Sequence, residues 1–127
     1  MRHTVKVYCL PASLSEVRLR EIHRGIVNAM IDTRELQVRG EEDFITLFIP
    51  DMMQYGLGSE ILVEIDLNND PELDRKSRNV IAERIGYVMV DALGNVKIQC
   101  RVYTFKEENG FWSWPRLQQI EAEPHRA

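Results

Sequence analysis

Two cysteines and three histidines are the side chains in this sequence best suited to nucleophilic or metal chemistry, and their spacing limits what they can do. Cys9 and Cys100 each stand in an alternating apolar stretch, without the close pairing of a zinc site or a redox dithiol. We expect both to be reduced core residues. His3, His23 and His125 are scattered, and none stands near a second ligand type at metal spacing. Neither a metal nor a cofactor is expected.

Other catalytic motifs do not compete in this sequence. No serine or cysteine stands in a recognisable nucleophile setting, and no glycine-rich loop opens a helix at phosphate-binding spacing. The acids Asp70, Glu72 and Asp74 are explained by a helix start, where the helix dipole favours negative charge.

Length and charge bound the class of protein. A chain of 127 residues with 44% hydrophobic content is enough for one domain with one core. Sixteen basic and 20 acidic residues give a net charge of -4, with no basic block, so neither nucleic acid nor anionic membrane is an expected partner. No apolar run reaches the length of a membrane span, and the first residues lack a signal-peptide core. We expect a cytoplasmic protein.

The first 50 residues predict a strand, a helix and a strand. Thr4 to Leu10 alternates with period two, which places Val5, Val7 and Cys9 on one side. Ser13 and Glu16 form a capping-box pattern before a helix from about 14 to 31, with apolar residues at Leu19, Ile22, Ile26 and Met30. The β-branched and aromatic run from Phe44 to Ile49 then predicts the second strand.

Residues 60–105 predict the same order again. Ile61 to Leu67 alternates, and Asp70 with Pro71 marks the start of a helix that Gly94 ends. In the last strand Val96, Ile98, Cys100 and Val102 share one face, and Lys97, Gln99, Arg101 and Tyr103 share the other. The fold class is α+β: two β-α-β halves (1–50 and 60–105) form a four-stranded mixed sheet with two helices on one face.

The sheet face away from the helices is too apolar for open solvent and too charged for a core. We expect it to carry Lys6, Tyr8, Phe44, Thr46, Phe48, Leu62, Glu64, Asp66, Lys97, Gln99, Arg101 and Tyr103. Either it is a solvated face with snorkelling side chains, or it lines the interior of an oligomer. Residues 106–127 contain a turn signal before Phe111, Trp112 and Trp114, which favours an intersubunit strand followed by a polar tail.

Three stretches resemble the tautomerase superfamily, in particular its macrophage migration inhibitory factor branch. They are Pro50 to Gly56 (PDMMQYG) with Ser59 and Glu60 ahead of a strand, Ile81 to Ile85 (IAERI), and Asn109 to Trp112 (NGFW). No single motif is specific, but their order and spacing agree with the duplicated topology over residues 4 to about 114.

The resemblance implies a homotrimer with a pocket between adjacent subunits, where an amino-terminal proline is the general base of keto-enol tautomerisation. Counting back from Pro11, that proline position falls on Arg2. Arginine in second position disfavours removal of Met1. A guanidinium cannot accept a proton near neutral pH, whereas the Met1 amine has an ordinary pKa of about 8. Met1 and Arg2 are therefore the catalytic candidates.

The same carry-over gives the substrate-binding candidates. Arg39 falls where the family has a basic pocket residue, and Gln99 and Arg101, with Tyr103 beside them, fall on pocket-lining positions. If Arg2, Arg39 and Arg101 converge, they suit a carboxylate or another small anion. Alternatively each pairs with an acid: Arg101 with Glu64 or Asp66, and Arg39 with Glu41 or Glu42.

Three functions remain open from the sequence. The protein is a keto-enol isomerase acting on a small carboxylate, or a non-catalytic trimer that binds an anionic metabolite or a protein. A ferredoxin-like binding module uses the same element order, but would show antiparallel pairing at the sheet edges.

Overall fold

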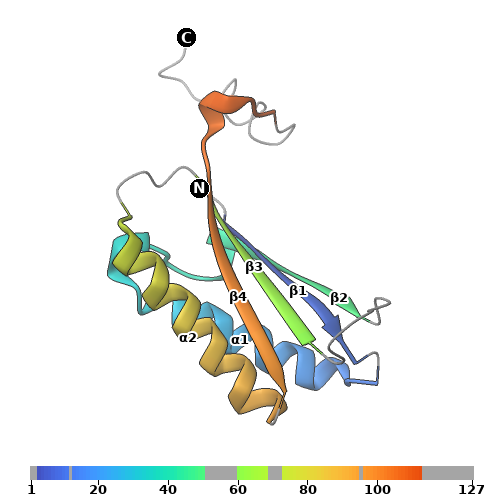
Figure 1. Ribbon diagram of the computed structural model, residues 1–127. Helices are drawn as coiled ribbons and strands as arrows, with labels where there is room; N and C mark the ends of the chain where they lie inside the picture. The colour runs from blue at the N-terminus through green and yellow to red at the C-terminus, as the bar shows by residue number, and fades with distance from the viewer. Residues whose placement is uncertain (1–2, 12, 51–59, 69–72, 95, 113–127) are drawn as a thin grey trace.

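The protein forms one sheet with two helices on one side (Figure 1). The computed structural model describes residues 3–11, 13–50, 60–68, 73–94 and 96–112. The elements are β1 (His3–Leu10), α1 (Glu16–Ile31), β2 (Phe44–Pro50), β3 (Glu60–Asn68), α2 (Arg75–Leu93) and β4 (Lys97–Phe105), with short 3-10 helices η1 (Arg34–Leu36), η2 (Glu41–Asp43) and η3 (Glu107–Asn109).

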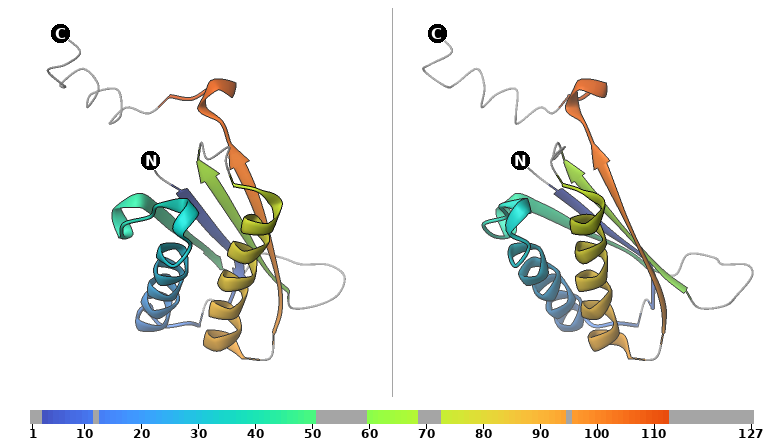
Figure 2. Two further views of the ribbon diagram at one scale, coloured as in Figure 1. Left: turned by 90° about the vertical axis from the view of Figure 1, so that its left-hand side faces the viewer. Right: turned by 60° about the vertical axis from the view of Figure 1, so that its left-hand side comes forward.

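The sheet topology confirms the two β-α-β halves. The strand order is β2-β1-β3-β4; β1 is parallel to β2, β3 is parallel to β4, and the two central strands are antiparallel. Both helices lie against one face of the sheet (Figure 2). Because both edge strands run parallel to their neighbours, the ferredoxin-like alternative is wrong.

The core lies between the helices and the sheet, where the expected apolar faces meet. Alternation along the two central strands puts every second side chain against the helices, and these residues are fully or almost fully buried: Val5, Val7, Ile61, Val63, Ile65 and Leu67. The helices contribute Ile22, Ile26 and Met30 from α1, and Ile81, Ile85 and Met89 from α2. The spacing predicted from the sequence for Ile22, Ile26 and Met30 of α1 is therefore confirmed.

The sequence-based prediction assigns the side chains of β2 to the wrong faces of the sheet. Val5 pairs with Thr46 and Val7 pairs with Phe48, so Thr46 and Phe48 lie on the helix side with those valines. The Thr46 hydroxyl also lies 2.7 Å from Nδ1 of His23 on α1. Ile45, Leu47 and Ile49 therefore occupy the opposite face of the strand. β2 is apolar at nearly every position, so its sequence has no alternation from which to choose a face.

The expected helix caps also differ from the structure. The α1 cap is Ser15 rather than Ser13, because the Ser15 hydroxyl accepts a hydrogen bond from the Arg18 amide. The α2 cap is Asp74, whose carboxylate accepts from the Ser77 amide at 2.8 Å. Asp70 and Pro71, expected at this helix start, lie outside the described residues. Gly94 ends α2 with a positive φ of 76°, as expected.

Cys9 departs from its expected core position. The pairing of β1 with β2 shifts between Tyr8 and Leu10, and Cys9 between them has a positive φ of 72°. This irregularity turns Leu10 into the core and leaves Cys9 half-buried. Both cysteines are free, as expected.

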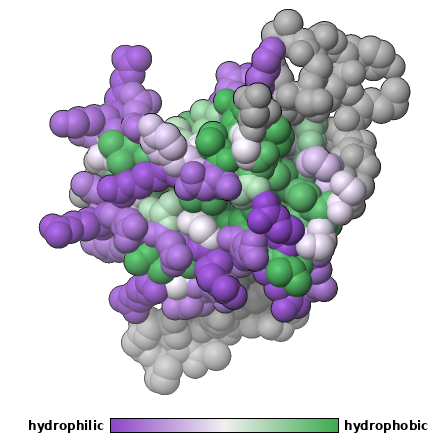
Figure 3. Space-filling model, turned by 90° about the horizontal axis from the view of Figure 1, so that it is seen from below, coloured by the Kyte–Doolittle hydropathy of each residue, from purple (hydrophilic) through white to green (hydrophobic). Residues whose placement is uncertain are grey.

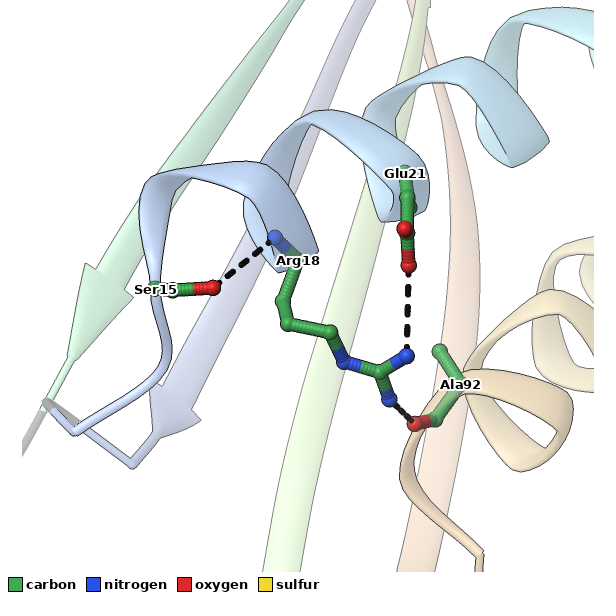
Figure 4. Close-up of polar contacts among 4 residues, drawn as sticks. All are labelled: Ser15, Arg18, Glu21 and Ala92. Carbon is green, nitrogen blue, oxygen red and sulfur yellow. Dashed lines mark hydrogen bonds and ion pairs between the residues drawn. The ribbon is translucent and has the colours of Figure 1, made fainter.

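Arg18 joins the beginning of α1 to the end of α2 (Figure 4). Its guanidinium donates to the carbonyl oxygen of Ala92 and, at 3.2 Å, to Oε2 of Glu21. A cation at this point satisfies a terminal carbonyl of α2 and opposes the negative end of that helix's dipole. The two helices are thus fixed side by side in antiparallel order.

Polar and apolar side chains are unevenly distributed over the molecule. Viewed from the end where α1 begins and α2 ends, hydrophilic side chains crowd the side on which the helices lie, and hydrophobic ones gather toward the sheet (Figure 3). Among the described residues, no helix is long and apolar enough to cross a membrane.

Candidate functional site

The candidate site lies on the sheet face that no described helix covers, which we call the open face. Its apolar part is on β2, where Ile45 and Leu47 are exposed. Its polar part runs over the other three strands through Lys6, Tyr8, Glu64, Asp66, Gln99, Arg101 and Tyr103. The expected mixture of apolar and charged groups is therefore present, with Ile45, Leu47 and Ile49 in place of Thr46 and Phe48.

Two polar pairs occupy the centre of the open face. Lys6 Nζ lies 3.7 Å from Asp66 Oδ2, and the Tyr8 phenol donates a hydrogen bond to Glu64. Both pairs join β1 to β3, whose register brings these residues close together. The carboxylates of the open face thus already have partners.

Arg101 has no carboxylate partner within the described part of the chain. It stands beside Glu64 in the register of β3 and β4, yet its guanidinium donates a hydrogen bond of 3.4 Å from Nη2 to Oε1 of Gln99 and none to a carboxylate of the described residues. The expected alternative ion pair of Arg101 with Glu64 or Asp66 is not formed. Gln99, Arg101 and Tyr103 project from alternate positions of β4, and all three are exposed. These side chains form a row of hydrogen-bond donors, and the positive charge in the middle of the row, that of Arg101, is not balanced by a carboxylate of the described residues.

A hydrogen bond of its backbone, not of its side chain, holds Arg39 in position. Its amide donates to Oδ2 of Asp43 at 2.7 Å, which closes the turn before β2 and leaves the side chain exposed. The expected ion pair with Glu41 or Glu42 is not formed among the described residues. Glu41 instead lies 3.3 Å from Nε2 of His23.

The sheet order keeps the expected arginines apart within one chain. Arg39 leads into β2, and Arg101 lies on β4; these are opposite edges of the sheet. Three strand spacings of about 4.8 Å separate edges of this kind by roughly 14 Å. Met1 and Arg2 lie outside the described residues, and β1 begins directly after them between β2 and β3.

Sequence reasoning missed the contacts of His23. This histidine joins α1 to Thr46 of β2 through Nδ1 and to Glu41 of η2 through Nε2. No local pattern links residues 23, 41 and 46, because their approach depends on how α1 crosses the sheet. The contacts fix the turn that carries Arg39.

Raised pKa values keep the Cys100 thiol and the Tyr8 phenol protonated. Burial raises the pKa of the Cys100 thiol to about 11, so it stays protonated at neutral pH. The hydrogen bond to Glu64 raises the pKa of Tyr8 above its ordinary value of 10.0, and partial burial and the charges of Glu64 and Asp66 add to the effect. Among the described residues, no cluster of histidine, cysteine and acidic side chains could hold a metal ion.

The Tyr8 assignment is testable by titration. We expect Glu64→Gln to lower the pKa of Tyr8 toward 10.0, because the amide lacks the charge that disfavours phenolate. A raised folded-state pKa means that the contribution of Tyr8 to stability is complete below 10.0 and is lost as pH rises through the folded value. Phenolate absorbance against pH, with Tyr8→Phe to identify the signal, measures the shift. An unchanged Tyr8 titration would contradict the hydrogen bond.

Comparison with known proteins supports the fold. No family model matches the chain, and no curated protein matches it significantly. Solved structures do match: a wild-type fused 4-OT asymmetric trimer (15% identity, TM-score 0.67, 87% of this chain and 91% of that chain), the macrophage migration inhibitory factor-like protein of Entamoeba histolytica (9%, 0.62, 88% and 94%), and the FG41 malonate semialdehyde decarboxylase (11%, 0.60, 98% and 100%).

These structures are all of the tautomerase superfamily type, so the chain has the tautomerase fold that its sequence resemblance indicated. The matches extend over several branches, and the fold does not single out the macrophage migration inhibitory factor branch.

Proposed function

We propose that this protein is a tautomerase-type keto-enol isomerase that acts on a small carboxylate at a site between subunits of a homotrimer. The observation that carries the proposal is the Arg101 guanidinium, which has no carboxylate partner among the described residues and is flanked by Gln99 and Tyr103 on a half-apolar surface. The fold of the matched isomerase, decarboxylase and migration inhibitory factor structures supports it.

The trimer is supported by the chemistry of the open face. Exposed Ile45 and Leu47 gain free energy when another sheet covers them, at roughly 25 cal/mol per Å² of apolar area removed from water. The matched fused 4-OT structure is itself a trimer. A neighbouring subunit that brings its β2 edge to the β4 edge would place Arg39 of one chain near Arg101 of the next, which one chain alone does not achieve.

Each candidate residue then has a role in the proposed reaction. Arg101 and Arg39 hold the substrate carboxylate by charge-assisted hydrogen bonds, which orient the neighbouring carbonyl. Gln99 and Tyr103 hydrogen-bond the carbonyl oxygen as enolate charge develops there. The base removes the proton from the carbon next to the carbonyl, and the oxygen takes up a proton to give the enol.

The proposal assigns the base to the amino group of Met1 and a stabilising role to Arg2. An amine with a pKa near 8 accepts a proton at working pH, whereas a guanidinium stays charged and can only stabilise the enolate. The intact mass of the purified protein tests whether Met1 is retained.

The test compares two charge-removing variants on one strand and one face. We expect Arg101→Ala to lower kcat/KM for tautomerisation of an arylpyruvate by about 10- to 100-fold, because a charge-assisted hydrogen bond is worth about 1.5–3 kcal/mol. Lys97→Ala removes the same charge from an exposed position of β4 and should leave the rate nearly unchanged. Equal losses in both variants, or no turnover by the parent protein, would overturn the isomerase assignment.

A second candidate, a non-catalytic trimer that binds a carboxylate, is favoured by one observation. The raised pKa values of Tyr8 and Cys100 keep both groups protonated, so neither supplies a base on or near the sheet. In that case small carboxylates would raise the melting temperature in proportion to RT ln(1 + [L]/Kd) without turnover. Arg101→Ala would abolish that stabilisation.

A further inference from the structure

A second candidate site lies on the helix side, away from the open face. Because α1 and α2 are antiparallel, the end of α1 lies beside the beginning of α2 (Figure 2). Between them is a groove of about 480 Å³, walled by Asp32 to Glu35 on one side and by the first three turns of α2 on the other. This volume lies within the range of small-molecule sites.

The cations of the groove have no carboxylate partner among the described residues. Arg34, Lys76 and Arg84 line it, and none of them takes part in an ion pair there. Arg84 is held in place, since its Nη1 donates at 2.9 Å to the hydroxyl of Thr33, which is 3% exposed. That hydroxyl in turn donates to the carbonyl oxygen of Ala29. No other hydrogen bond of the Arg84 guanidinium to a described residue is formed, so its remaining donors can bind a ligand in the groove.

The acids of the groove fall into two kinds. The Asp74 carboxylate caps its own helix, where it accepts hydrogen bonds from the amide and side chain of Ser77. These hydrogen bonds lower the pKa of the Asp74 carboxyl. Asp32 and Glu35 stand at the end of α1, are exposed, and form no ion pair with a described residue. On the α1 side the two acids Asp32 and Glu35 outnumber the single cation Arg34, and on the α2 side the two cations Lys76 and Arg84 outnumber the single acid Asp74.

This division of charge decides which ligand suits the groove. A simple anion would be attracted by Arg84 and Lys76 but repelled by Asp32 and Glu35. A simple cation would be attracted by the two acids but repelled by Arg84 and Lys76. A molecule that carries both a carboxylate and an ammonium group can present one charge to each wall. We propose that the groove binds a small zwitterion of the α-amino acid class. The inference does not depend on the proposed isomerase activity.

Three probes that differ only in their charged groups test this proposal. L-norvaline carries both charges, valerate lacks only the ammonium, and butylamine lacks only the carboxylate. In an amide chemical-shift titration of the full chain we expect norvaline to shift residues 32–35 and 76–84, and to bind at least about tenfold tighter than either single-charge probe. Valerate binding as tightly as norvaline, or the absence of norvaline shifts in these segments, would overturn the proposal.

Matched variants locate the two contacts. Lys76→Ala and Asp32→Asn, both at exposed positions, should each weaken norvaline binding about tenfold, since each removes one charge-assisted hydrogen bond. Arg75→Ala removes a charge from the same turn of α2 but does not line the groove, and should change the affinity by less than about twofold. Norvaline affinity that is insensitive to Lys76→Ala would contradict the site. Circular dichroism verifies that each variant is folded.

Discussion

Replacing Leu47 with glutamate is expected to separate the proposed trimer into folded monomers. Leu47 is 43% exposed in a single chain and lies at the middle of the apolar part of the open face. Covering a leucine side chain is worth about 1.5–3 kcal/mol, and a closed trimer would lose this at each of its interfaces. Each glutamate would also have to lose water without a partner, because the nearby cation Lys6 is already paired with Asp66.

Light scattering measures the effect directly. We expect the parent protein to scatter as a trimer and Leu47→Glu to approach the 14.8 kDa of one chain, with an unchanged circular dichroism spectrum. Activity toward the arylpyruvate should fall in parallel, since the proposed site needs residues from two subunits. A variant that keeps the parent mass would show that the open face is not the interface.

Val17→Glu is the matched control for this experiment. Val17 is also an exposed hydrophobic residue, 65% exposed, but it lies in the first turn of α1 on the helix side of the molecule. Glutamate at this position adds the same charge but lies outside the proposed interface. A negative charge in the first turn of a helix is also favourable, because it interacts with the helix dipole. If Val17→Glu dissociates the protein as well, the effect of Leu47→Glu is one of net charge and not of the open face.

The second large effect is expected at the centre of the core. Ile65→Ala should lower the free energy of unfolding by about 2–5 kcal/mol, because a cavity forms where neither helix can fill it. Ile65 is 0% exposed on the central strand β3 and faces the helices. Urea unfolding followed by circular dichroism gives the difference, at a concentration low enough that association contributes equally to both proteins.

Ile31→Ala provides the comparison for that measurement. Ile31 is 39% exposed at the end of α1, so the same atoms are removed from a place that water already reaches. Its substitution should cost less than half as much as Ile65→Ala, since little buried area is lost. Similar losses at the two positions would contradict the arrangement of the core between the helices and β3.

The fold followed from the sequence wherever a local period existed. Alternation in β1, β3 and β4 identified three strands and their inward residues, such as Val5, Val63 and Val102, because strand geometry sends successive side chains to opposite faces. The spacing of Ile22, Ile26 and Met30 likewise identified the buried face of α1. The duplicated order of elements and its resemblance to the tautomerase superfamily agreed with the fold of the matched structures.

Local signals failed where several choices were chemically equal. Ser13 and Ser15 can both cap a helix, and only the path of the chain leaving β1 made Ser15 the one whose hydroxyl reaches the Arg18 amide. In β2 both faces are apolar, and the parallel register with β1 decided that Thr46 and Phe48 point toward the helices. Pairing between strands depends on residues that are far apart in the sequence, so no short segment of the sequence predicts it.

The candidate site shows the same division between sequence and structure. The sequence by itself determined which side chains β4 sets on one face, so Gln99, Arg101 and Tyr103 were correctly placed together. Only the tertiary structure decided that Lys6 and Tyr8 take the nearby carboxylates, that Arg101 pairs with no acid in the described part of the chain, and that Arg39 lies at the opposite edge of the sheet. The physical reason is that side-chain direction follows from local backbone geometry, whereas charge pairing and the distance between edges depend on the order in which strands assemble.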